Sequence, residues 1–170
     1  MRLRLFALVA FCATLVGSVR AEEAGEVEDF DRFYLGVAAE MLLPQGGSRL
    51  HHVGGATLRG GAYLSESWAV EGAAAWLEDM AGLSASSLHH WQGWSAYGDL
   101  FGYSRFDPFL TVGVSGWLGK RGQVGPTAGL GAFYHLTDTW SLRFDATATL
   151  GLETEVEVDY TLAAGIQMSF

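Results

Sequence analysis

The last 15 residues, 156–170, constrain the fold more than any other stretch, because their side chains alternate strictly in character. The bulky apolar residues all occupy even positions: Val156, Val158, Tyr160, Leu162, Ile166, Met168 and Phe170. The charged and amide side chains, Glu157, Asp159 and Gln167, all occupy odd positions. Since successive side chains of a β-strand point to opposite faces, this segment predicts one long strand with an apolar face and a polar face.

The same two-residue period recurs along the chain and predicts eight strands without any helix. We expect these strands at 33–43, 54–64, 68–78, 91–102, 108–118, 125–136, 140–151 and 156–170. Residues 79–90 are then the longest irregular segment, and the connections after the odd-numbered strands are longer than those after the even-numbered strands. Such an even-stranded meander is typical of an all-β, eight-stranded, antiparallel up-and-down transmembrane β-barrel.

The residues before the first strand have a different character. Residues 1–21 combine Arg2 and Arg4, an apolar run and small residues suitable for cleavage, which predicts a secretory signal peptide. Cys12, the only cysteine, lies inside this segment, so the mature protein is predicted to contain no disulfide. Residues 22–32 contain six acids and predict a disordered acidic tail, which leaves 33–170 as the barrel.

The charge composition limits the partners of this chain. Its formal net charge is −9, and removal of the signal peptide takes away three arginines but no acid, so nucleic acid is a poor partner. Charged residues make up 17% of the sequence, with a single lysine, whereas about a quarter is usual for soluble domains. This shortage predicts that much of the surface does not face water.

Three further features favour a membrane over water as the surroundings of the apolar face. The polar face consists mostly of Gly, Ala, Ser and Thr, which suit a narrow interior. The strands have the length that a tilted crossing needs. Aromatic residues near the strand ends predict two interfacial girdles: Phe33, Trp68, Phe109, Trp140 and Phe170 at one rim, and Trp76, Trp94, Trp117 and Tyr160 at the other. The alternative, a soluble lipocalin-like carrier, would need an apolar interior.

Charged residues on the inward face predict a network inside the barrel. They are Glu40, Arg59, Glu71, Asp99, Arg143 and Asp145. Because an unpaired buried charge is very costly, we expect Arg59 to bridge Glu40 and Glu71, and Arg143 to pair with Asp145 or Asp99. The network is interpreted as an ion-pair plug, with a gated pore or proton path as the alternative.

The predicted outer loops contain the remaining candidate residues. His51-His52 and His89-His90 are expected in the first two outer loops, where four imidazoles could bind a metal. A histidine there could also serve a lipid-modifying hydrolase with Ser84, Ser86 or Ser87 and with Glu78 or Asp79, but no nucleophile motif supports this. We therefore predict no catalytic residue, metal or cofactor. Lys120 and Arg121 are expected to contact lipopolysaccharide phosphates.

Two short segments and the terminal aromatic residue carry a family resemblance. The chain has F-Y-L-G-V at 33–37 and W-A-V-E-G at 68–72, and ends on Phe170 after alternating apolar residues. It resembles the small OmpA-like and OmpX-like outer-membrane β-barrel proteins. The resemblance implies insertion by the barrel-assembly machinery, which would recognise the last strand through Tyr160, Ile166, Met168 and Phe170. It also implies that the termini and short turns face the periplasm, while the longer loops face outside.

These observations predict a monomeric, non-enzymatic protein of the bacterial outer membrane with a structural role. Its expected partners are outer-membrane lipid and lipopolysaccharide, besides the assembly machinery. A narrow channel or small-ligand-binding barrel is the alternative, and a lipid-modifying enzyme is a weaker one.

Overall fold

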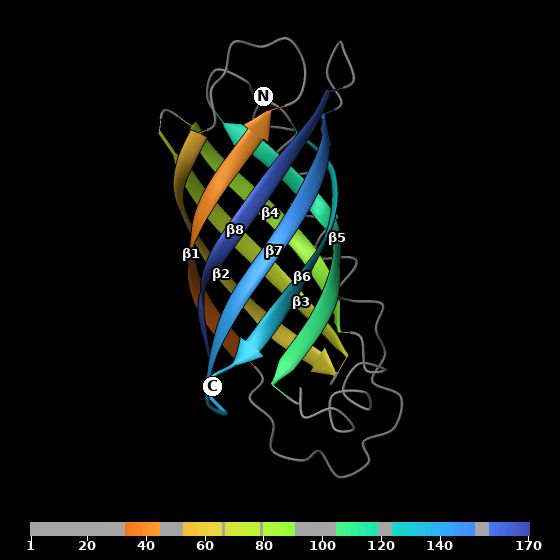
Figure 1. Cartoon of the computed structure of the whole chain (residues 1–170). Coiled ribbons are helices and arrows are strands. Elements are labelled where there is room, and N and C mark those ends of the chain that lie inside the picture. The colour runs from red at the N-terminus through yellow and green to blue at the C-terminus, as the bar shows by residue number, and fades with distance from the viewer. Residues whose placement is uncertain are drawn as a thin grey trace. The chain divides into compact units, whose positions relative to one another are not determined.

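The computed structural model describes residues 33–44, 53–65, 67–78, 80–90, 105–118, 124–151 and 157–170. They form eight strands that close into one antiparallel barrel in sequence order (Figure 1). The strands are β1 (Phe33–Pro44), β2 (Val53–Ser65), β3 (Trp68–Leu77), β4 (Met80–His90), β5 (Phe106–Leu118), β6 (Val124–His135), β7 (Trp140–Gly151) and β8 (Glu157–Ser169). Among the described residues, no helix is long and apolar enough to cross a membrane.

The barrel closes through pairing of the first strand with the last. The register of β1 and β8 runs from Tyr34 opposite Ser169 to Pro44 opposite Asp159. Phe33 and Phe170 exchange two backbone hydrogen bonds, of 3.0 and 2.8 Å. Closure leaves no unpaired strand edge, which a barrel in hydrocarbon requires. We call this end of the barrel the Phe170 end and the other the opposite end.

The apolar parity points outward, and this confirms the predicted fold class. Phe144 on β7 is 52% exposed and Leu130 on β6 is 63% exposed, whereas Thr57 and Arg143 are buried. A water-soluble barrel would show the reverse distribution, because it buries its large apolar side chains. An outward apolar band with a polar interior is the arrangement of a transmembrane barrel.

The position of the fourth strand differs from the sequence prediction. β4 occupies Met80–His90, where an irregular loop was expected, while the predicted strand 91–102 lies outside the described residues. The pattern is weak because both faces of β4 carry small residues, such as Ser84 and Ser86 inward and Ala81 and Ala85 outward. A two-residue connection with Glu78 at positive φ (44°) joins β3 to β4, as tight hairpin turns allow.

This shift also overturns the expected alternation of loop lengths. The connection between β3 and β4 lies at the opposite end and spans only residues 78–79. The longest connection, residues 91–105, instead joins β4 to β5 at the Phe170 end. Length alone therefore does not distinguish the two ends of this barrel.

Two of the expected girdle aromatics point into the barrel. Phe109 is 2% exposed and Trp117 is 6% exposed, because both occupy the inward parity of β5 together with Thr111. Their nearness to the strand ends was misleading, since parity decides which face a side chain occupies. The exposed rim residues are Phe33, Trp68, Trp140 and Phe170 at one end, and Trp76 and Tyr160 at the other. Trp94 lies outside the described residues.

Apolar clusters occupy the interior near both ends. The cluster near the Phe170 end contains Tyr34, Ala69, Leu88, Phe109 and Phe133, with Tyr63 packed against it. The cluster near the opposite end contains Leu42, Val53, Ala75, Leu77 and Trp117, with Met80 packed against it. Gly82 provides the space for one of these rings, since a Cβ there would lie 2.5 Å from Trp117. Five charged residues, Glu40, Arg59, Glu71, Arg143 and Asp145, lie in the section between the clusters.

Candidate functional site

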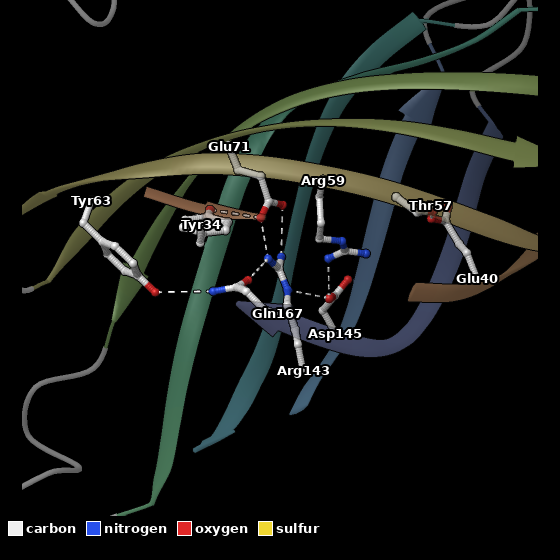
Figure 2. A network of polar contacts seen from close by, with 9 residues as sticks. All are labelled: Tyr34, Glu40, Thr57, Arg59, Tyr63, Glu71, Arg143, Asp145 and Gln167. Carbon is white, nitrogen blue, oxygen red and sulfur yellow. Dashed lines mark hydrogen bonds and ion pairs between the residues drawn. The ribbon is translucent and has the colours of Figure 1, made fainter. Parts of the chain in front are cut away.

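An ion pair that crosses the lumen forms the centre of the interior network (Figure 2). Arg143 on β7 donates from Nη2 to Oε1 of Glu71 on β3 at 3.1 Å, and from Nη1 to Oε2 of the same carboxylate. β3 and β7 are four strands apart in the ring of eight, so the pair connects facing walls. Both side chains are largely buried. The two-pronged geometry is the strongest that a guanidinium and a carboxylate can adopt.

Asp145 extends this pair into a chain of charges. Its Oδ2 accepts a hydrogen bond from Nε of Arg143 at 2.9 Å and another from Nη1 of Arg59 at 2.7 Å. Arg143 and Asp145 share a face because they are two residues apart on β7, while Arg59 reaches across from β2. Asp145 therefore compensates two buried guanidinium groups at once.

Neutral side chains complete the surroundings of the central pair. Tyr34 donates its hydroxyl hydrogen to Oε2 of Glu71 at 3.0 Å. Nη1 of Arg143 lies 3.5 Å from Oε1 of Gln167, whose Nε2 lies 3.5 Å from the Tyr63 hydroxyl. The guanidinium carbon of Arg143 also lies 4.9 Å from the ring centre of Phe109, a cation–π distance. The network is thus anchored on the cluster near the Phe170 end.

The pairing of Arg59 differs from the sequence prediction. Arg59 pairs with Asp145, not with Glu40 and Glu71. Register explains the first difference: Arg59 lies opposite Gly36 on β1, four residues and therefore about 13 Å along the strand from Glu40. The second difference arises because Glu71 forms its ion pair with Arg143. The structure thus brings together five of the six expected residues in one section, and Asp99 lies outside the described residues.

Glu40 is bound differently from the other two carboxylates. Its Oε2 accepts a hydrogen bond from the hydroxyl of Thr57 on the neighbouring strand β2. Glu71 and Asp145, in contrast, each accept hydrogen bonds from a guanidinium group. Glu40 therefore stands at the edge of the charge chain, on the side away from Phe109.

Replacing Glu40 with glutamine is expected to change the free energy of unfolding by less than about 1 kcal/mol, because the amide oxygen can still accept from Thr57. The matched variant Glu71→Gln should cost about 3–5 kcal/mol, because it removes one charge from a buried pair. Urea titrations of both refolded variants in lipid vesicles measure the difference. Equal losses in the two variants would contradict the distinction between these carboxylates.

A polar cavity of about 80 Å³ lies beside the network. Hydroxyl-bearing residues form much of its lining: Thr57, Ser84, Ser86, Thr111, Ser115, Thr127, Thr147, Thr149 and Thr161. Arg59, Arg143 and Glu40 also border it, and Nε of Arg59 has no hydrogen-bond partner among the described residues. A cavity of this size and polarity suits a few ordered water molecules.

A second polar group, which the sequence did not reveal, lies at the Phe170 end. Nδ1 of His90 is 2.6 Å from Oδ2 of Asp107, and Nδ1 of His135 is 2.8 Å from the Ser141 hydroxyl. The His90 ring stacks on Phe133, with centroids 5.6 Å apart. His90 and His135 end β4 and β6, and Asp107 and Ser141 lie near the starts of β5 and β7. The contact of His90 with Asp107 follows only when β4 is placed correctly.

The same placement overturns the expected histidine cluster. His89 and His90 belong to β4 at the Phe170 end, whereas Val53, the first residue of β2, lies at the opposite end. His51 and His52 lie outside the described residues. Within the described ranges, no three His, Cys, Asp or Glu side chains are arranged to hold a metal ion.

The other candidate residues are placed as follows. Ser84 and Ser86 line the polar cavity. The hydroxyl of Ser87 donates a hydrogen bond to the carbonyl oxygen of Val112. Glu78 is exposed in the turn between β3 and β4. On β8 and beyond it, Tyr160, Ile166 and Phe170 point outward and are exposed, while Met168 is half-buried. Lys120, Arg121 and Asp79 lie outside the described residues.

The similarity of this chain to known proteins lies in the structure alone. No family model and no curated protein matches this sequence. Neisserial surface protein A is similar in structure, with a TM-score of 0.61 and 14% identity over 81% of this chain and 97% of that chain. The outer-membrane protein OprG from Pseudomonas aeruginosa has a TM-score of 0.56 and 12% identity, over 83% and 96% of the two chains. A transmembrane β-barrel designed de novo has a TM-score of 0.59 and 12% identity, over 84% and 98%.

These similarities agree with the closed ring of eight strands, the outward apolar parity and the charged interior. At such low identity they concern the fold alone. The chain therefore has the fold of the small eight-stranded outer-membrane β-barrels, the class that the OmpA-like and OmpX-like resemblance indicated.

Proposed function

We propose that this protein is a non-enzymatic structural barrel of the bacterial outer membrane, filled by its own side chains. The observation that carries the proposal is the ion pair between Glu71 and Arg143, which crosses the lumen between facing walls. Apolar clusters lie on both sides of it along the barrel. An eight-stranded barrel is just wide enough for side chains to fill, so a blocked lumen is the expected state.

Passage of ions would require the central pair to separate. Each charge would then lose its buried partner, which costs several kcal/mol, and both apolar clusters would also have to move. The proposed role is accordingly mechanical: a rigid cylinder that occupies the membrane and presents loops on its surface.

Planar-bilayer recordings test this proposal directly. The purified, refolded wild-type protein is expected to show no steady conductance, because the charged section and the two clusters block the path. Heat-dependent electrophoretic mobility confirms that the added protein is folded. A steady, sizeable conductance of the wild type, whether or not Arg59→Ala alters it, would contradict a filled barrel and favour the narrow-channel alternative.

The expected partners follow from the same location. The outward apolar residues Ile166 and Phe170 are accessible for recognition of the last strand by the barrel-assembly machinery. Contact of Lys120 and Arg121 with lipopolysaccharide stays a prediction, as does the monomeric state.

A further inference from the structure

The charged section of the interior contains one more carboxyl group than guanidinium groups. Its described members are Glu40, Glu71 and Asp145, against Arg59 and Arg143. Glu71 and Asp145 each form an ion pair with an arginine, so Glu40 is the surplus acid. Glu40 is half-buried and accepts a hydrogen bond from Thr57. A carboxyl group inside a barrel needs further polar contacts, because incomplete solvation of such a group is costly.

Arg59 has the complementary requirement, because it carries a buried donor that needs an acceptor. The residue is 6% exposed, and its Nη1 donates to Asp145 at 2.7 Å. Its Nε is buried and has no hydrogen-bond partner among the described residues. In Figure 2 the side chain of Arg59 lies between the crossing pair and Glu40. Since an unsatisfied buried donor costs free energy, Nε requires an acceptor in the space beside it.

The polar cavity provides this space. Arg59 and Glu40 both line it, and its volume of about 80 Å³ has room for at least two water molecules at about 30 Å³ each. Small side chains leave this volume open. Ala73 lies opposite Arg59 in the register of β2 and β3, and Ala75 lies opposite Thr57.

Three hydroxyl groups of the cavity lining already donate to protein acceptors. The Thr149 hydroxyl donates to Thr127 at 3.2 Å, and the Thr127 hydroxyl donates to the carbonyl of Ala148 at 3.1 Å. Because Thr149 gives its hydrogen to Thr127, Ser115 is the donor in the 2.8 Å contact between Ser115 and Thr149. These three hydroxyls therefore offer acceptors but no hydrogen to the cavity, and they suit an occupant that can donate.

We propose that the cavity binds ordered water, and that one molecule accepts from Nε of Arg59 and donates to the carboxyl group of Glu40. Water meets both requirements because it is a donor and an acceptor. A bound anion would lie in a section that already has a surplus acid, and a metal cation would face the guanidinium group of Arg59. The inference rests on the proposed filled barrel, whose lumen is blocked by side chains but hydrated at its centre.

Water-edited solid-state NMR of the refolded full chain in lipid vesicles tests this site, because it measures magnetisation transfer from water to side-chain N–H groups. The two buried arginines provide an internal comparison. Nε of Arg143 donates directly to Asp145 at 2.9 Å, whereas Nε of Arg59 is the proposed water contact. Transfer to Nε of Arg59 is expected to be about threefold stronger than transfer to Nε of Arg143. Transfer to Arg59 that is no stronger than transfer to Arg143 would overturn the proposal.

Filling the cavity gives a second test. Ala73→Leu places a larger side chain beside Arg59 and should reduce water transfer to its Nε about threefold. The matched control Ala74→Leu adds the same bulk on the outward face of β3 and should leave this transfer unchanged. Equal transfer in the two variants would overturn the proposal. If Ala73→Leu does not fold, as judged by heat-dependent mobility on gels, Ala73→Val is held to the same criterion.

Two further measurements separate the alternatives. A rise in the urea midpoint with Na⁺ that the same concentration of choline does not reproduce would indicate a bound cation and overturn the water site. The bilayer recordings described above test the filled barrel independently. A non-conducting barrel with a dry centre would overturn the water site alone, whereas a steady conductance would contradict the filled barrel.

Discussion

Replacing Arg143 with methionine is expected to lower the free energy of unfolding by about 3–5 kcal/mol, the usual cost of removing one partner from a buried ion pair. Arg143 is 4% exposed, and its side chain donates to both Glu71 and Asp145. Methionine is similar in length but leaves Glu71 without its guanidinium partner and Asp145 with Arg59 alone. Unfolding by urea in lipid vesicles, followed by tryptophan fluorescence, measures the loss.

A double variant distinguishes lost charge pairing from lost packing. Glu71→Gln combined with Arg143→Met removes both members of the crossing pair and should recover a large part of the loss, because no uncompensated carboxylate then remains at position 71. If the double variant is as unstable as the sum of the two single variants, the ion pair does not account for the effect of Arg143.

Truncating Phe109 to alanine should cost a comparable amount, about 3–5 kcal/mol, because it opens a cavity in a packed interior. The ring packs against Phe133, with centroids 4.8 Å apart, and lies beneath the guanidinium group of Arg143. Gly131 on the neighbouring strand leaves the space that the ring occupies. The same urea titration applies, with an additional bilayer recording to detect any conductance that the cavity permits.

Leu110→Ala is the control for this variant, since it removes a large apolar side chain from the adjacent, outward position of β5. Leu110 is exposed and meets lipid, which can fill the space that the truncation leaves. A much smaller loss is therefore expected. Equal losses at positions 109 and 110 would argue that the ring of Phe109 does not help to hold the interior together.

The fold was predictable because the two-residue period depends on individual side chains and needs no long-range information. β7 was predicted with the bounds that it has, since large residues such as Phe144 alternate there with Arg143 and Asp145. β4 was missed because Ser84 and Ala85 differ too little to mark two faces. A strand was therefore predicted correctly where the side chains on its two faces differ strongly in polarity and size.

The sequence predicted which residues of the candidate site face the interior, but not which of them pair with one another. Parity placed Arg59 and Glu71 inside the barrel, yet which charges meet depends on strand register and on contacts across the lumen. Arg59 reaches Asp145, which is 86 residues away in sequence, and no local pattern contains that information. The contact between His90 and Asp107 was missed because His90 belongs to β4, which the sequence did not place correctly.

The crossing contact between β3 and β7 has a consequence for the order in which the barrel can mature. Glu71 and Arg143 are 72 residues apart in sequence and lie on facing walls, so their contact requires both β3 and β7 to be in place. Tyr34 and Glu71 are only 37 residues apart, and their hydrogen bond needs just the first three strands. A sheet that lacks either β3 or β7 therefore holds one of these charges without its countercharge, and the pair is neutralised only when the two facing walls have come together.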